Sequence, residues 1–408
     1  MRANKRHIIL WALGAASLAN LALGGLWSQP LLAACGVIGL GYVLLRAGSA
    51  FRQRRVKHAD CSPAARKPAA RRPRQPADPN DTDALVGQML AQERYALLLR
   101  RQIADNLDDG QLQRAVEALE EGMALVPDGE VVLGAIDEAL DDGELDEEEI
   151  AAYQGRVIRV QHFFLDRYPV TNAQFYEFVA GGGYEQMSLW DESIWPAVLD
   201  FVDATGQPGP RFWNHGCYPP GRDRHPVVGV SWYEAAAYAR WVGKRLPTDA
   251  EWVKAGSWPV SPSAHARLQR RYPWGETMDR TRANLWGSGP GGIAPVDRFS
   301  GGVSVGGVYD LIGNVWEWTR GDFCAADSPQ FDVPSGVPLK NIRGGAYDTY
   351  FDNQATCHFP SGEVPVTRKH NIGFRCAVGV CDLILVRTAG DVAASEELET
   401  ASAEEVQI

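Results

Sequence analysis

The chain has 408 residues, of which 45% are hydrophobic and 42 are glycine, so it is long enough for one large globular domain with additional segments. Its formal net charge of -11 argues against a nucleic-acid partner, because proteins that bind nucleic acids are usually basic. The seven cysteines show no zinc-ligand spacing.

Residues 1–50 contain two uncharged, apolar stretches, 8–27 and 31–45, with basic residues before and after the pair. As a helix, the first run would be roughly 30 Å long, enough to cross a bilayer, and the second run is shorter. Basic flanks favour the cytoplasmic side. We therefore predict a membrane anchor, a two-helix hairpin in a bacterial-type inner membrane, with the soluble domain on the cytoplasmic side. The alternatives are a single span or a lipid anchor at Cys35, which would place the domain in the periplasm.

Residues 51–82 form a basic linker that is rich in proline and alanine and cannot bury a core. Residues 83–120 follow with apolar side chains at helical spacing, which predicts two helices separated by a break at residues 108–110. These helices either stack on the main domain or form a dimerisation element. An acidic tail occupies residues 389–408.

Residues 121–388 hold short β-like runs, such as 156–166, and a few helices. Thr171 is placed to cap a helix over residues 172–179. Ser231, with glutamate three residues later, predicts a second helix up to residue 242, and a similar Thr-x-x-Glu pattern at Thr248 predicts a third. The remaining sequence is rich in turns, which indicates an α+β domain with little regular structure.

The stretch GVYDLIGNVWEWT, residues 307–319, combines glycines, aromatic residues and carboxylates in a way that neither a strand nor a helix requires. One interpretation is a tight turn in which Trp316 and Trp318 are core residues and Asp310 and Glu317 accept hydrogen bonds. The other is a site for a hard cation such as Ca²⁺, which prefers carboxylates beside exposed carbonyl groups.

Together with its neighbours, this stretch resembles the formylglycine-generating enzyme family, also called the sulfatase-modifying-factor family. The resemblance rests on blocks that occur in the same order: MALVPDGEVVLG, FFLDRYPVTNAQFYEFV, HPVVGVSWYEAAAYARWVGKRLPTDAEW, YPWG, RANLW, APVDRF, GVYDLIGNVWEWT, IRGGAY and NIGFRCA. It implies an irregular α+β fold that is related to C-type lectin domains and covers roughly residues 122–380.

In catalytic members of this family, a cysteine pair binds copper(I) and supports the oxidation of a substrate cysteine. The positions that match the pair are Thr349 and Gln354, and Ala346 replaces a serine of the family. Neither side chain is the soft thiolate that copper(I) prefers. Cys357, the nearest thiol, does not match either ligand position. We therefore expect a vestigial active site without copper.

The resemblance also implies a structural Ca²⁺ in residues 307–319. Its ligands here would be the side chains of Asp310 and Glu317 and the carbonyl groups of Gly313 and Val315. Aspartate replaces an asparagine of the family at residue 310, which adds charge and favours a hard cation.

A second Ca²⁺ site of the family begins with Asn284 and the carbonyl group of Leu285. Its other half lies in a loop that is contracted here to GSGPGG, so the sequence implies only one half of this second site. The family's disulfide cysteines are replaced at Ala239 and Gly256, which leaves Cys376 without its implied partner. Their loss agrees with a reducing compartment.

The residues therefore favour a catalytically inactive domain of this family that is tethered to a membrane and binds a protein or peptide partner. The alternative is a divergent oxidoreductase or maturation factor, of formylglycine-generating or non-haem-iron type, that acts on a protein or a metabolite. No His-x-x-x-His pair supports the three-histidine iron site of the second type.

Overall fold

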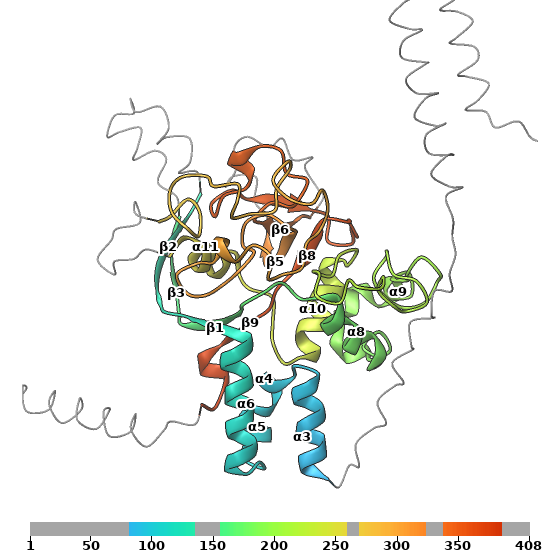
Figure 1. The fold of residues 1–408 in the computed structure, drawn as a ribbon. Coiled ribbons are helices and arrows are strands. Elements are labelled where there is room, and N and C mark those ends of the chain that lie inside the picture. The colour runs from blue at the N-terminus through green and yellow to red at the C-terminus, as the bar shows by residue number, and fades with distance from the viewer. Residues whose placement is uncertain (1–80, 135–155, 259–268, 324–337, 386–408) are drawn as a thin grey trace, which may run out of the picture. The chain divides into compact units, whose positions relative to one another are not determined.

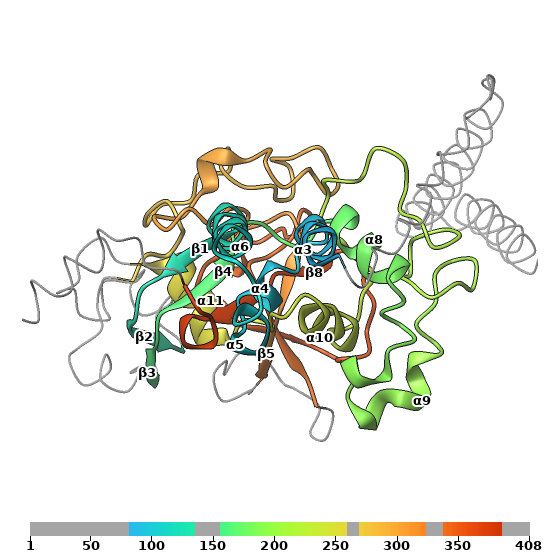
Figure 2. The ribbon, with the colours of Figure 1, turned by 90° about the horizontal axis from the view of Figure 1, so that it is seen from below.

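The computed structural model describes residues 81–134, 156–258, 269–323 and 338–385. Its elements are shown in Figure 1 and, turned by 90°, in Figure 2. The helices are α3 (Thr82–Ala91), α4 (Tyr95–Leu98), α5 (Arg101–Ala104), α6 (Asp109–Gly122), α8 (Asn172–Ala180), α9 (Trp195–Val198), α10 (Trp232–Trp241) and α11 (Asp249–Ser257). The strands are β1 (Met123–Val126), β2 (Gly129–Leu133), β3 (Arg156–Val160), β4 (Phe163–Asp166), β5 (Trp316–Asp322), β6 (Lys340–Arg343), β7 (Ser361–Glu363), β8 (Ile372–Phe374) and β9 (Ala377–Gly379).

The strands form three small sheets, and long loops connect them. The first has the order β1-β4-β9, the second pairs β2 with β3, and the third has the order β7-β6-β5-β8. In the third sheet β5 pairs with β8 in parallel, whereas β6 runs antiparallel to both β5 and β7. The described residues thus form the mixed α and β architecture with little regular structure that the sequence predicted.

The three predicted capped helices are confirmed. α8, α10 and α11 begin after Thr171, Ser231 and Thr248, and each cap residue forms a reciprocal capping box with the side chain three positions later. Because such a box satisfies two backbone donors at the start of a helix, it defines where the helix begins. These boundaries are set by local chemistry, which explains why the sequence revealed them.

The N-terminal helical region differs from the prediction, because α3, α4 and α5 replace its first helix. The chain turns at Glu93, whose φ of 58° is left-handed. The Arg94 side chain then donates to the Trp241 carbonyl group at 3.1 Å, and the Tyr95 hydroxyl contacts Lys244 Nζ at 2.7 Å. These tertiary contacts override the helix propensity of this segment. The predicted break before the second helix is present, but that helix, α6, already begins at Asp109, directly after its cap Asp108.

Of the two predicted roles for these helices, the structure shows stacking on the domain. Leu98 and Leu119 are buried in one cluster with Met123, Phe164 and Val378, which belong to β1, β4 and β9. In Figure 1 these helices lie below β1 and β9, next to α10. The apolar faces of the helices are therefore buried within the same chain.

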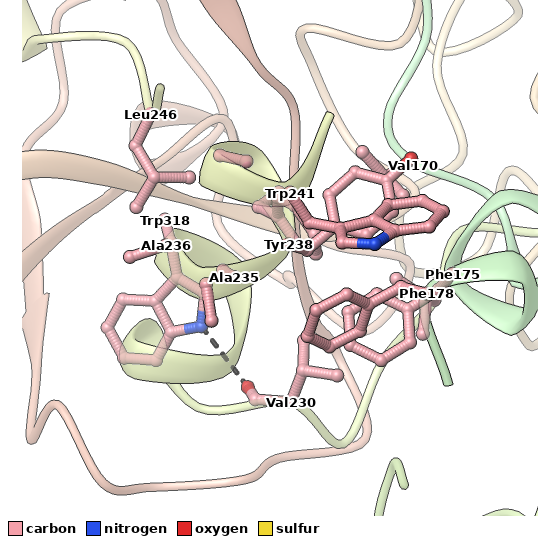
Figure 3. Close-up of a cluster of buried hydrophobic side chains, with 14 of the residues drawn as sticks. Val170, Phe175, Phe178, Val230, Ala235, Ala236, Tyr238, Trp241, Leu246 and Trp318 are labelled. Atoms are coloured by element: carbon pink, nitrogen blue, oxygen red, sulfur yellow. Dashed lines mark hydrogen bonds between the residues drawn. The ribbon is translucent and has the colours of Figure 1, made fainter. Parts of the chain in front are cut away.

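The largest core cluster lies between α8, α10 and β5 (Figure 3). Phe175 and Phe178 from α8 pack against Tyr238 and Trp241 from α10, with ring centroids 5.4 to 6.3 Å apart for the pairs Phe175–Tyr238, Phe178–Trp241 and Tyr238–Trp241. Trp318 of β5 is fully buried, and its indole N–H donates to the Val230 carbonyl group at 3.3 Å. This core fixes the start of β5, and with it the turn that precedes β5 in the chain.

No helix among the described residues is both long and apolar enough to cross a membrane. The predicted hairpin and the lipid-anchor alternative at Cys35 lie outside the described residues, as do the linker up to residue 80 and the acidic tail.

Candidate functional site

The turn before β5 is built from residues in unusual backbone conformations. Asp310, Gly313 and Asn314 have φ values of 53°, 80° and 65°, which lie in the left-handed region. Gly313 is required there, because a Cβ atom would lie 2.5 Å from the Asn284 carbonyl oxygen. The Asn314 side chain donates to Asp310 Oδ2 at 3.2 Å, which closes the turn. The turn therefore aims the side chains of Asp310 and Asn314 into the protein.

Glu317 is fully buried and is part of an ion pair. Its Oε1 and Oε2 atoms accept from Arg375 Nη2 and Nε at 2.6 and 2.7 Å, and Oε2 also accepts from Trp252 Nε1 at 2.8 Å. A bidentate guanidinium compensates the carboxylate charge at this buried site. In this arrangement Glu317 is a hydrogen-bond acceptor, as one of the two sequence interpretations predicted.

Asp310 is less well compensated. Burial raises the pKa of its carboxyl group to about 7, although the nearby Arg375 charge and the hydrogen bond from Asn314 lower the pKa. The side chain is only 5% exposed and has one amide donor. A buried carboxyl group of this kind either holds a proton or needs a neighbouring cation.

Asn284 lies on the other side of Asn314. Its side-chain amide donates to Asn314 Oδ1 at 3.0 Å and to the Gly292 carbonyl group at 2.9 Å. Its Oδ1 atom is buried, and among the described residues it has no hydrogen-bond partner. The Leu285 carbonyl group instead accepts from Ser288. Thus the Asn284 Oδ1 atom, at the second implied calcium site, is not used by a hydrogen bond from a described residue.

These contacts test the calcium sites that the sequence implied. The oxygens of Asp310 and Asn284 fit a hard cation, because they are buried and poorly compensated. The Gly313 carbonyl group accepts from the Val315 amide at 2.8 Å and retains a second lone pair. Glu317 fits less well, since Arg375 occupies both of its oxygens.

The loop that carries Ala346, Thr349 and Gln354 follows β6 and is closed on itself. The Thr349 hydroxyl accepts from the Ala346 amide at 2.8 Å, and the Thr349 amide donates to the Ala346 carbonyl group at 2.9 Å. Thr349 is 6% exposed and Ala346 is fully buried. Gln354 ends a short 3-10 turn that begins at Asp352. The side chain at residue 349 therefore stabilises a turn here.

Cys357 lies beneath this loop and is fully buried. A Cβ atom added at Gly256 would lie 2.8 Å from its Sγ atom. Gly256 is a position at which the resemblance implied a lost disulfide cysteine. The thiol of Cys357 thus lies where that cysteine's partner would be, a relationship that the sequence did not reveal.

Three exposed aromatic side chains, which the sequence did not reveal, belong to this loop and to the segment that it contacts. We call Trp286, Tyr350 and Phe351 the aromatic platform; they are 57%, 63% and 59% exposed. The Trp286 amide donates to the Thr349 carbonyl group at 3.2 Å, which joins the two segments. The available signal was the sequence TYFDN, in which two consecutive aromatic residues stand beside an aspartate and an asparagine.

Asp348, in the same loop as Tyr350 and Phe351, contacts polar side chains from the segment before β8. The Asn371 amide donates to both carboxylate oxygens of Asp348 at 3.1 and 3.2 Å, and His370 Nε2 lies 3.4 Å from Asp348 Oδ2. Tyr347 packs edge-on against the His370 ring at 6.2 Å between centroids. Asp348 is held in a defined orientation by these contacts.

Within residues 81–134, 156–258, 269–323 and 338–385, no group of three or more His, Cys, Asp or Glu side chains is placed to hold a metal ion.

Comparison with known proteins identifies the family. The serine/threonine-protein kinase Pkn1 of Chlamydia trachomatis is 36% identical over 230 residues, which are 55% of this chain and 34% of that protein. Hercynine oxygenase of Mycolicibacterium smegmatis is 38% identical, over 55% of this chain and 53% of that protein. The mouse inactive C-alpha-formylglycine-generating enzyme 2 is 33% identical, over 54% of this chain and 77% of that protein.

The chain spans about a third of the length of the first of these relatives and about half of the second. Residues 109–380 match the family model of the sulfatase-modifying factor enzyme 1-like domain, which confirms the resemblance seen in the sequence. The match includes α6, every strand among the described residues and the loops of the candidate site. The chain belongs to the sulfatase-modifying factor enzyme 1-like domain family.

Proposed function

We propose that this domain is a catalytically inactive member of its family, that it is tethered to a membrane, and that it serves as a binding or assembly module for a protein partner. The observation that carries the proposal is the structure of the loop from Ala346 to Gln354. Thr349 uses its hydroxyl group to close the turn, and no thiol lies at either position that would supply a copper ligand.

Two relatives support a role without this chemistry. One of them is named an inactive formylglycine-generating enzyme, so the family includes members described as inactive. Another is named a protein kinase, and the matched segment is only 34% of its length. A similar domain therefore also occurs as one part of a larger protein that is named for another activity.

Calcium is proposed as a structural ion. Asp310 would hold it together with the carbonyl groups of Gly313 and Val315. A second ion would be held by Asn284, whose Oδ1 atom is buried without a hydrogen-bond partner among the described residues, and by the Leu285 carbonyl group. Glu317 would join only by giving up part of its contact with Arg375. Saturating Ca²⁺ at about 100 times its dissociation constant should raise the stability of the chain by about 2.7 kcal/mol, and a chelator should remove this gain.

The cytoplasmic location is proposed from the basic residues that flank the apolar stretches in residues 1–50. A reporter that is active only in the periplasm should be inactive when it is fused after Ile408. Strong activity of this reporter would favour a single span or the lipid anchor at Cys35.

A second candidate function is supported by the identity of 38% with a hercynine oxygenase. Under this alternative the chain is a divergent oxidoreductase that acts on a protein or a metabolite. Its site would have to use ligands other than a thiol pair at residues 349 and 354, since these residues are Thr and Gln.

Chemical cross-linking in the native host, followed by purification of the full-length chain, tests the binding role. We expect one defined polypeptide at a fixed ratio to the chain. A chain that retains stoichiometric iron or copper, consumes oxygen and yields no cross-linked polypeptide would favour the oxidoreductase.

A further inference from the structure

We propose, independently of the partner-binding role, that the acidic tail of this chain, residues 389–408, binds in a groove beside β3. The groove has a volume of about 590 Å³ and lies between β3, the start of α11 and the chain just after β9. Asn341 at the start of β6 and the last residues of β5 also line it. The candidate calcium turn precedes β5, and the loop with Tyr350 and Phe351 of the aromatic platform follows β6, so the groove is a separate surface.

The groove runs along an unpaired strand edge. Among the described residues β3 pairs only with β2, in antiparallel register from Arg156 opposite Leu133 to Val160 opposite Gly129. Only alternate residues of an antiparallel strand bond to a given neighbour, so the other backbone donors and acceptors of β3 point away from β2. Most of β3 lines the groove. An extended segment can add to such an edge through main-chain hydrogen bonds.

The uncompensated charge of the groove is positive. Each carboxylate of its lining already has a cationic partner, in the pairs Asp249–Arg343, Glu251–Arg245, Asp322–Lys340 and Asp382–Arg100. Arg156 lines the groove and has no carboxylate partner among the described residues. The same holds for Arg320, which is exposed and precedes the groove residue Gly321 in β5. These arginines favour a segment that carries carboxylates.

The acidic tail has the matching charge and begins close to the groove. Cys381 and Asp382 line the groove, and the described chain continues from them to Leu385. Residue 389 is seven residues beyond Asp382, which an extended chain spans in at most about 25 Å. Residues 389–408 contain six acidic residues and no lysine or arginine. Because a tethered segment has an effective concentration of about millimolar, even a weak contact is populated.

The exposed thiol of Cys381 reports directly on this contact, because a tail in the groove would cover it. The test compares the rate at which a maleimide alkylates Cys381 in the purified full-length chain and in a variant whose six acidic tail residues are replaced by their amides. Mass spectrometry resolves the labelled peptides. We expect the amidated-tail variant to react about tenfold faster at Cys381. Cys217, a partly exposed cysteine that does not line the groove, should react equally fast in both chains.

A second pair of substitutions separates docking from a general effect of charge on the thiol. The loss of a nearby arginine disfavours the thiolate and would by itself slow alkylation. Arg156→Gln with Arg320→Gln should instead release the tail and raise the rate at Cys381 about tenfold. In the amidated-tail variant the same two substitutions should not accelerate the reaction. Arg298→Gln, which removes an exposed arginine outside the groove, is the matched control and should leave the rate unchanged.

A synthetic peptide of residues 389–408, added to the amidated-tail variant at about millimolar concentration, should slow alkylation of Cys381 again, and its amidated version should not. Equal protection by both peptides would overturn the inference. So would an unchanged rate in the amidated-tail variant, or slower alkylation after Arg156→Gln with Arg320→Gln. Protection that disappears when the full-length chain is diluted would place the tail in the groove of a second copy and overturn the contact within one chain.

Discussion

Arg375 and Glu317 form a bidentate ion pair in the centre of the domain, with both side chains at most 1% exposed. Arg375 follows β8 and Glu317 lies in β5, so the pair joins two parallel neighbours of one sheet. The guanidinium also donates to the carbonyl groups of Asp166 and Tyr309. The pair thus ties β4 and the turn before β5 to the same point.

Removing one partner of this pair should be costly. Arg375→Met leaves Glu317 buried and uncompensated, and we expect a loss of about 3–5 kcal/mol in the free energy of unfolding. Urea denaturation measures this loss. Arg114→Ala, which breaks an exposed pair with Asp83, is the control and should change stability far less. Similar effects of both variants would contradict the assigned role of Arg375.

Asp310 should make stability depend on pH. Its pKa is raised to about 7 by burial, from 3.8, so the folded state retains the proton between these values while the unfolded state releases it. The stabilising contribution of Asp310 is therefore fully present below about pH 4 and declines as the pH rises towards 7. For a shift of this size, the free energy of unfolding should fall by roughly 4 kcal/mol.

This dependence is measured as the free energy of unfolding against pH in the presence of a chelator. Asp310→Asn should remove most of the decline, because the amide does not titrate. Added Ca²⁺ should also reduce the decline if the ion binds beside the ionised carboxylate. An unchanged profile in Asp310→Asn would show that other groups cause the dependence.

The Thr349 hydroxyl should be needed for stability. Thr349→Val has nearly the same shape but leaves the buried Ala346 amide without its acceptor, which we expect to cost about 1–3 kcal/mol. Thr349→Ser keeps the hydroxyl group and should cost less. Equal losses for Val and Ser in urea denaturation would mean that the methyl group, not the hydrogen bond, stabilises the loop.

A cysteine at residue 256 should form a disulfide with Cys357. The distance of 2.8 Å between the added Cβ atom and Sγ is close to that in a disulfide. Closing a loop of about 100 residues should add up to about 4–5 kcal/mol under oxidising conditions. The gain should vanish with a reductant, and Gly256→Ser should show no gain. A variant that oxidises but gains nothing would indicate strain at this site.

The sequence predicted the elements that local chemistry determines. The capping residues Thr171, Ser231 and Thr248 lie next to the backbone groups that they satisfy, so short patterns revealed three helices. The break at Glu93 depends on contacts of Arg94 and Tyr95 with residues about 150 positions away, which no local pattern contains.

The same distinction holds for the candidate site. The sequence located the turn with Asp310 and the loss of the thiol pair at residues 349 and 354, because both depend on residue types in matched blocks. It did not reveal that Arg375 donates to both carboxylate oxygens of Glu317, nor that the Trp286 amide contacts the loop at Thr349. Both relationships join segments that are far apart in the chain.

The central claim is that the loop from Ala346 to Gln354 has lost the oxidative chemistry of the family and that the domain binds a partner. A titration of the full-length chain with copper(I) against a competing chelator, with oxygen uptake recorded in parallel, tests this claim most directly. We predict that the chain neither binds copper(I) stoichiometrically nor takes up oxygen, and that Cys357→Ala behaves in the same way. Stoichiometric binding with oxygen uptake, both abolished by Cys357→Ala, would contradict the claim and make that thiol catalytic.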